Sequence, residues 1–148
     1  MGVSTDAYLV YGIPLEEEDS YNLWLDGARF DTRYLDEEDI YYCLINNIDV
    51  GFLFEVFSYN ELYEKIKEFK KQNCISPFCI ETHCSDNYPM HIIHVPDHLH
   101  SASRGYPEKI ENLEVDKEKE QAFLDFVKKY APELDTKQLG WYLCSYWG

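Results

Sequence analysis

Runs of β-branched and aromatic residues, separated by turn-forming residues, set the pattern of the first part of the chain. Ala7 to Ile13 is such a run and is stopped by Pro14, so it predicts a strand. Ile40 to Ile45 and Val50 to Phe57 are two more runs, with the turn-rich stretch from Asn46 to Asp49 between them. These two runs therefore predict a β-hairpin.

A helical spacing of apolar residues comes next. Ser58 and Glu61 form a capping box, and Leu62, Ile66 and Phe69 then recur three to four residues apart. This pattern predicts a helix over residues 59–72.

Strand and helix patterns alternate again in the second half of the chain. Phe78 to His83 and Met90 to Val95 predict two strands joined by a turn-rich connection, whereas residues 96–115 look irregular. Asp116 then predicts the cap of a second helix that ends near Tyr130, because apolar residues recur at helical spacing between them.

The final run of the chain, Trp141 to Trp147, predicts one more strand. Aromatic residues fall on both of its faces, so we expect this strand to be interior to the sheet or covered on both sides. The order of elements predicts an α+β fold: a mainly antiparallel sheet of about five to six strands with two helices packed on one face. No linker-like stretch divides the chain, so we expect residues 1–148 to form a single domain.

Charge adds a functional constraint to this picture. The chain of 148 residues carries 28 acidic and 13 basic side chains, a net charge of −15. Residues 1–61 hold 14 of the acids against two arginines, which gives −12 for that part alone. Such a surface repels nucleic acid and anionic membrane, and it favours a basic protein surface as partner. Two runs concentrate the acids and are the predicted partner-binding residues: Glu16, Glu17, Glu18, Asp19 and Asp36, Glu37, Glu38, Asp39.

The cysteines and the N-terminus bear on location. The chain has five cysteines, an odd number, and its N-terminus shows no secretory signal pattern. We therefore expect free thiols and a cytoplasmic protein.

All five histidines lie between residues 83 and 100, and this clustering raises the question of a metal site. The candidate ligands are His83, Cys84, His91, His94, His98 and His100. Imidazole and thiolate suit zinc, but no pair of them has the spacing of a zinc hook, and on a strand His91 and His94 point to opposite faces. We therefore predict no cofactor, and we keep as the alternative a small metal-binding protein or hydrolase centred on residues 83–104.

Four stretches of the chain show a resemblance to other proteins: residues 1–7, the Thr82-His83-Cys84-Ser85 segment with Tyr88-Pro89-Met90, residues 103–107 and residues 141–148. They resemble a family of small bacteriophage proteins. The resemblance implies a viral gene product made in a bacterial cytoplasm, but it implies no activity and no catalytic residue.

Two functions from different classes follow. The first is a non-enzymatic binding protein whose acidic N-terminal surface imitates nucleic acid and inhibits a host nucleic-acid-handling protein, such as a defence nuclease. The second is the metal-binding protein or hydrolase of residues 83–104. Convergence of three histidine or cysteine side chains on one point would favour the second, and their dispersal would favour the first.

Overall fold

The computed structural model describes residues 5–15, 37–46, 59–72, 76–85 and 87–147. The chain divides into two compact units: a sheet unit of residues 1–20 and 77–148, and a helical unit of residues 21–76. Each is described here by itself, and the single domain expected from the sequence stays a prediction.

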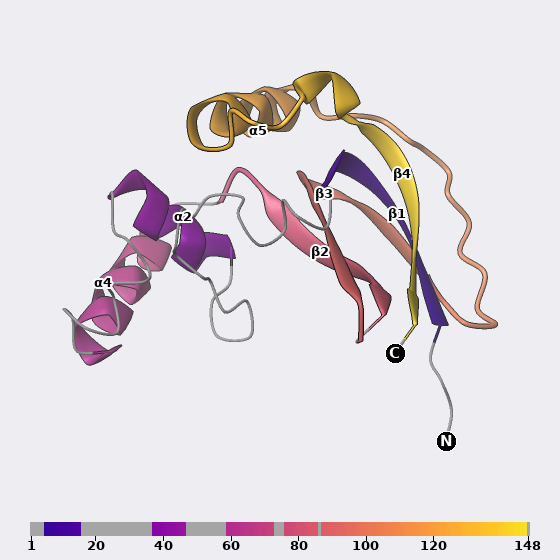
Figure 1. The fold of residues 1–148 in the computed structure, drawn as a ribbon, viewed down its shortest axis with the longest axis horizontal. Coiled ribbons are helices and arrows are strands. Elements are labelled where there is room, and N and C mark those ends of the chain that lie inside the picture. Colours follow the sequence, from indigo (N-terminus) through magenta and orange to yellow (C-terminus); the bar gives the residue numbers. More distant parts are fainter. Residues whose placement is uncertain (1–4, 16–36, 47–58, 73–75, 86, 148) are drawn as a thin grey trace. The chain divides into compact units, whose positions relative to one another are not determined.

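Strand β1, Thr5–Pro14, is the centre of the sheet unit. It pairs antiparallel with β3, Pro89–Ser103, on one side and with β4, Gly140–Trp147, on the other. Strand β2, Cys79–Ser85, pairs antiparallel with β3 and parallel with the last two residues of β4. The four strands thus close in the order β1-β3-β2-β4, and Figure 1 shows the strongly curved sheet that results.

A large irregularity bends β3 in its middle. Val10 of β1 faces Leu99, whereas Gly12 faces His94, so Tyr11 alone lies opposite four residues of β3. Asp97, within this bulge, has a φ of 63°. The expectation that residues 96–103 are irregular is therefore wrong, because the bulge absorbs the chain-breaking segment and the strand continues to Ser103.

The bend brings two backbones very close together. A Cβ atom added to Gly12 would lie 2.1 Å from the carbonyl oxygen of Ile93. Only glycine therefore fits at this crossing of β1 and β3.

Helix α5, Lys117–Tyr130, lies across one end of the sheet (Figure 1). The Asp116 side chain caps it as predicted, by accepting hydrogen bonds from the backbone amides of Glu118 and Lys119. Phe123, Phe126 and Val127 on its inner side are buried, and a short 3-10 helix, Thr136–Gln138, leads from it into β4.

The core of the sheet unit joins this helix to the segment that enters β2. The rings of Phe78 and Phe126 stack with centroids 4.4 Å apart and an interplanar angle of 11°. Val10, Ile92 and Ile93 of the sheet are fully buried. Burying each of these side chains contributes roughly 1.5–3 kcal/mol to stability.

The helical unit contains α2, Glu37–Ile45, and α4, Tyr59–Lys71. Helix α4 confirms the helix expected over residues 59–72. Helix α2 shows that the strand expected over Ile40 to Ile45 is wrong, and with it the predicted hairpin. The other strand of that hairpin, residues 50–57, lies outside the described residues.

Contacts between the two helices account for this difference. The Phe69 ring of α4 lies 5.1 Å from the Tyr42 ring and 6.1 Å from the Tyr41 ring of α2. The Lys70 ammonium lies 3.3 Å from a carboxylate oxygen of Asp39. Such tertiary contacts override the weak preference of β-branched and aromatic residues for strands.

The α+β class predicted from the sequence is confirmed. Its details differ, because the described residues form a mixed sheet of four strands and three α-helices rather than five to six strands and two helices. Among these helices none is both long and apolar enough to cross a membrane.

Candidate functional site

The acidic run at residues 36–39 opens a helix. Glu37, Glu38 and Asp39 form the first turn of α2, where carboxylates are stabilised by the helix dipole. Asp39 is engaged by Lys70 and is mostly shielded from solvent. These three acids therefore have a structural explanation. The remaining predicted partner-binding residues lie outside the described residues: Glu16, Glu17, Glu18, Asp19 and Asp36.

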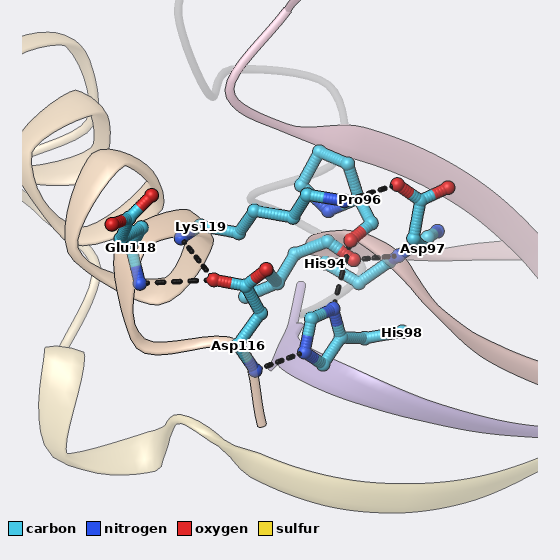
Figure 2. Close-up of polar contacts among 8 residues, drawn as sticks. His94, Pro96, Asp97, His98, Asp116, Glu118 and Lys119 are labelled. Atoms are coloured by element: carbon cyan, nitrogen blue, oxygen red, sulfur yellow. Dashed lines mark hydrogen bonds and ion pairs between the residues drawn. The ribbon is translucent and has the colours of Figure 1, made fainter. Parts of the chain in front are cut away.

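His98 holds the β3 bulge to the start of α5, as Figure 2 shows. The backbone amide of Asp116 donates to Nε2 of His98 at 2.9 Å, so the ring proton belongs on Nδ1. Nδ1 in turn donates to the carbonyl of Pro96 at 2.8 Å. Both ring nitrogens of this buried side chain are therefore occupied, and neither is available to a metal ion.

A second contact fastens the same two segments. Lys119 of α5 forms an ion pair with Asp97 of the bulge (Figure 2). Its hydrogen bond and charge hold the pKa of Asp97 below the ordinary value, and Asp97 raises the pKa of Lys119. We call this arrangement of Asp97, His98, Asp116 and Lys119 the bulge clasp.

His94 is also used by the fold. Its side chain is 4% exposed, and Nδ1 donates to the Val95 carbonyl at 2.9 Å. Nε2 lies 4.0 Å from a carboxylate oxygen of Glu81 on β2. His100, further along β3, has its ring 5.9 Å from that of Trp141.

His83 and His91 each have one buried ring nitrogen without a hydrogen-bond partner among the described residues. His83 faces Met90 in the β2–β3 register and His91 faces Thr82, which places the two rings on opposite faces of this pair of strands. Burial lowers the pKa of both, and the charge of His83 lowers that of His91 further. Both rings are thus held in the neutral form at pH 7.

No metal centre is assembled within the part of the chain that the structure describes. It contains no group of three or more histidine, cysteine, aspartate or glutamate side chains that could hold a metal ion. His83 and Cys84 lie on β2, and His91, His94, His98 and His100 are distributed along both halves of the bent β3.

Two of the described thiols, Cys43 and Cys144, are in surroundings that disfavour the thiolate. Burial raises the pKa of Cys43 to about 12 and raises that of Cys144, so both favour the protonated form. Cys84 is exposed and has a φ of 77°. Cys74, which the sequence also predicts to be a free thiol, lies outside the described residues.

An aromatic cluster packs beside the bulge clasp. The Tyr11 hydroxyl donates to a carboxylate oxygen of Glu120 on α5 at 2.5 Å, and burial and this contact raise the pKa of Tyr11 to about 12. The Trp141 ring lies 5.2 Å from that of Tyr11 and 6.2 Å from that of His98. This cluster fixes α5 on the sheet.

The outer face of β4, defined by Leu143, Ser145 and Trp147, is a different kind of surface. Leu143 is 79% exposed and Trp147 is 61% exposed. The strand itself is as predicted, and it lies inside the sheet, between β1 and β2 in the closed order. Its outer face is nevertheless exposed. Alternation along the strand leaves Tyr142, Cys144 and Tyr146 half-buried and exposes Leu143, Ser145 and Trp147 to solvent.

Sequence reasoning did not identify this surface as a site. The sequence does show that these side chains share a face, because Leu143, Ser145 and Trp147 follow one another at intervals of two residues along the strand. The pattern of the strand alone does not say whether that face is covered.

Comparison of the chain with protein-family models, with curated proteins and with solved structures finds no match in any of the three.

Proposed function

We propose that the protein is a non-enzymatic binding protein that docks on a basic surface of another protein through the outer face of β4. The observation that carries this proposal is the exposure of Leu143 and Trp147 on one face of a strand whose opposite face is half-buried. Large apolar side chains grouped on a surface mark interaction sites, and tryptophan is enriched among the residues that dominate binding energy.

The histidines and cysteines that a catalytic or metal site would need also support a binding function. His94 and His98 spend ring nitrogens on contacts that hold the fold, and the pKa of the Cys43 and Cys144 thiols is raised. No observation on the described residues favours the metal-binding or hydrolase alternative of residues 83–104.

The negative charge of this chain indicates that the partner's surface is positively charged. A net charge of −15 attracts a basic surface over long distances and speeds association. Because lysines and arginines arranged for phosphates also accept carboxylates, a nucleic-acid-handling host protein remains the partner that we propose within this class. The acidic runs supply the attraction, and the outer face of β4 supplies the apolar contact.

Capture experiments with matched variants test the proposal. The native chain, immobilised, is expected to retain a basic protein from bacterial lysate that double-stranded DNA competes away. Leu143→Ser with Trp147→Ser should abolish this capture. The control is Tyr63→Ser, which alters an exposed aromatic residue on α4 instead.

Charge reversal at Glu17, Glu18, Glu37 and Glu38 tests the electrostatic part separately. It should weaken capture most at low salt, where charges are least screened. If the β4 double variant retains the same proteins as the native chain, the proposed binding face is wrong.

A further inference from the structure

Three exposed aromatic residues, Tyr88, Trp147 and Tyr106, stand at the same end of the sheet. Trp147 pairs with Ser85 at the end of β2 and with Thr5 at the start of β1. It therefore occupies the centre of this end, opposite the end that α5 covers (Figure 1).

The two tyrosines are attached on either side of Trp147. The Tyr88 amide donates to Oγ of Ser85 at 3.1 Å, and the Tyr106 amide donates to the carbonyl of Ser103 at 2.9 Å. Ser103 is the last residue of β3 and pairs with Asp6 of β1. The order across this end is thus β2, β4, β1 and β3, and at the usual strand spacing it spans about 15 Å.

We call Tyr88, Trp147 and Tyr106 the aromatic row. Tyr88 is 72% exposed and Tyr106 is 73% exposed, so all three rings offer most of their surface to solvent. Aromatic rings with this exposure are the side chains that interfaces use as anchors.

An acidic side chain stands within the aromatic row. Asp6 lies within the row, between the ends of β4 and β3. Burial raises the pKa of Tyr8 on β1, and the charges of Asp6 and Glu81 raise it further. Arg104, which follows β3, offsets one of these charges, but the chain as a whole remains at −15.

We propose that the aromatic row binds arginine side chains of an extended segment in the basic partner. The inference rests on the proposed function and specifies the chemistry of its partner. A guanidinium group is planar and weakly hydrated, so it stacks on tyrosine and tryptophan faces more readily than a lysine ammonium does. An extended segment of about four to five residues spans the length of the row.

Synthetic peptides of defined chemistry provide the probe. Binding of octa-arginine, octa-lysine and octaproline to the full native chain is measured by titration calorimetry in ~0.15 M salt, where surface charges are partly screened. Octa-arginine and octa-lysine carry the same side-chain charge, so a difference between them reports stacking. We expect octa-arginine to bind roughly three- to tenfold tighter than octa-lysine.

Tyr88→Leu with Tyr106→Leu, both outside the strands, should reduce this preference to less than about twofold. The matched control is Tyr63→Leu on α4, which should leave the preference unchanged. Thermal unfolding of each variant establishes that it is folded before titration.

Equal affinity of the native chain for octa-arginine and octa-lysine would overturn the inference, and so would tighter binding of octaproline. The inference also fails if the double tyrosine variant keeps the full preference for arginine. These failures leave the proposed function standing as long as the β4 double variant loses partner capture, so the two tests separate the two claims.

Discussion

The bulge clasp and the outer face of β4 lie in the same sheet unit and treat their side chains in opposite ways. In the clasp, His98 has a partner on each ring nitrogen and Asp97 is paired with Lys119. On β4, the large apolar side chains of Leu143 and Trp147 remain exposed. The polar groups of the clasp are therefore engaged by the fold, whereas these two apolar side chains are left exposed.

This difference separates structural from functional candidates. Clustered histidines in a sequence suggest a functional site. A histidine whose two ring nitrogens are both hydrogen-bonded to the backbone, however, has a structural role. An exposed leucine is a weak signal by itself, but its exposure on the same strand face as a tryptophan lowers solubility and contributes nothing to the core.

The largest loss of stability is expected from a substitution in the core. Phe123→Ala removes a fully buried ring of α5 and should lower the free energy of unfolding by about 3–5 kcal/mol. Denaturant unfolding measures it. Leu143→Ala is the matched apolar truncation on β4, and a comparable loss there would show that the outer face is covered after all.

A smaller effect is expected at the bulge clasp. His98→Ala leaves the Asp116 amide and the Pro96 carbonyl without their partner and should cost about 1–3 kcal/mol. His100→Ala, on the same strand, is the control in the same denaturant experiment. If both variants unfold alike, His98 does not carry the contact between β3 and α5.

The two helices with local signals were predictable from the sequence. In the sequence, the pattern of Ser58 and Glu61 indicates the start of one helix and Asp116 indicates the start of the other, and in both the spacing of apolar residues agrees with that start. The β1 and β4 runs were predictable for a similar reason, because each is a run of strand-forming residues bounded by proline or glycine.

Two features depend on contacts that sequence patterns do not contain. Residues 40–45 are apolar and aromatic throughout and suit a strand, but Phe69 of α4 meets Tyr41 and Tyr42 and the segment is a helix. Pro96 and Asp97 suggest a break, but the bulge lets β3 continue. In both cases a contact with a segment far along the chain determines the local structure. For the same reason the sequence could name the candidate histidines but could not predict which side chains each of them contacts.

Acid should weaken the sheet unit through His83 and His91. Their pKa values are lowered in the folded protein, so the unfolded chain binds more protons once the pH falls below its ordinary histidine pKa. Stability is therefore full above about pH 6.5 and falls as the pH drops toward the folded-state pKa values. Melting temperatures between about pH 7.5 and pH 5.5 measure this.

The double variant His83→Gln with His91→Gln provides the control, because glutamine does not titrate. Its melting temperature should change less over the same pH range than that of the native chain. An unchanged slope would assign the acid sensitivity to other groups and remove these two orphaned nitrogens from the explanation.

The smallest effect on stability is expected on the outer face of β4, and it completes the contrast. Leu143→Lys exchanges an exposed leucine for a charge and should alter the free energy of unfolding by no more than about 0.5 kcal/mol, because little apolar area leaves the core. The same substitution should lower the binding of an apolar dye and raise the solubility limit, since it removes an exposed apolar side chain from the face that also carries Trp147. Lys128→Leu on α5 is the reverse exchange at an exposed position, and it should raise dye binding. Should Leu143→Lys instead unfold the protein, the side chain is part of the core, and the division between a scaffold that is satisfied and a surface left for a partner does not hold.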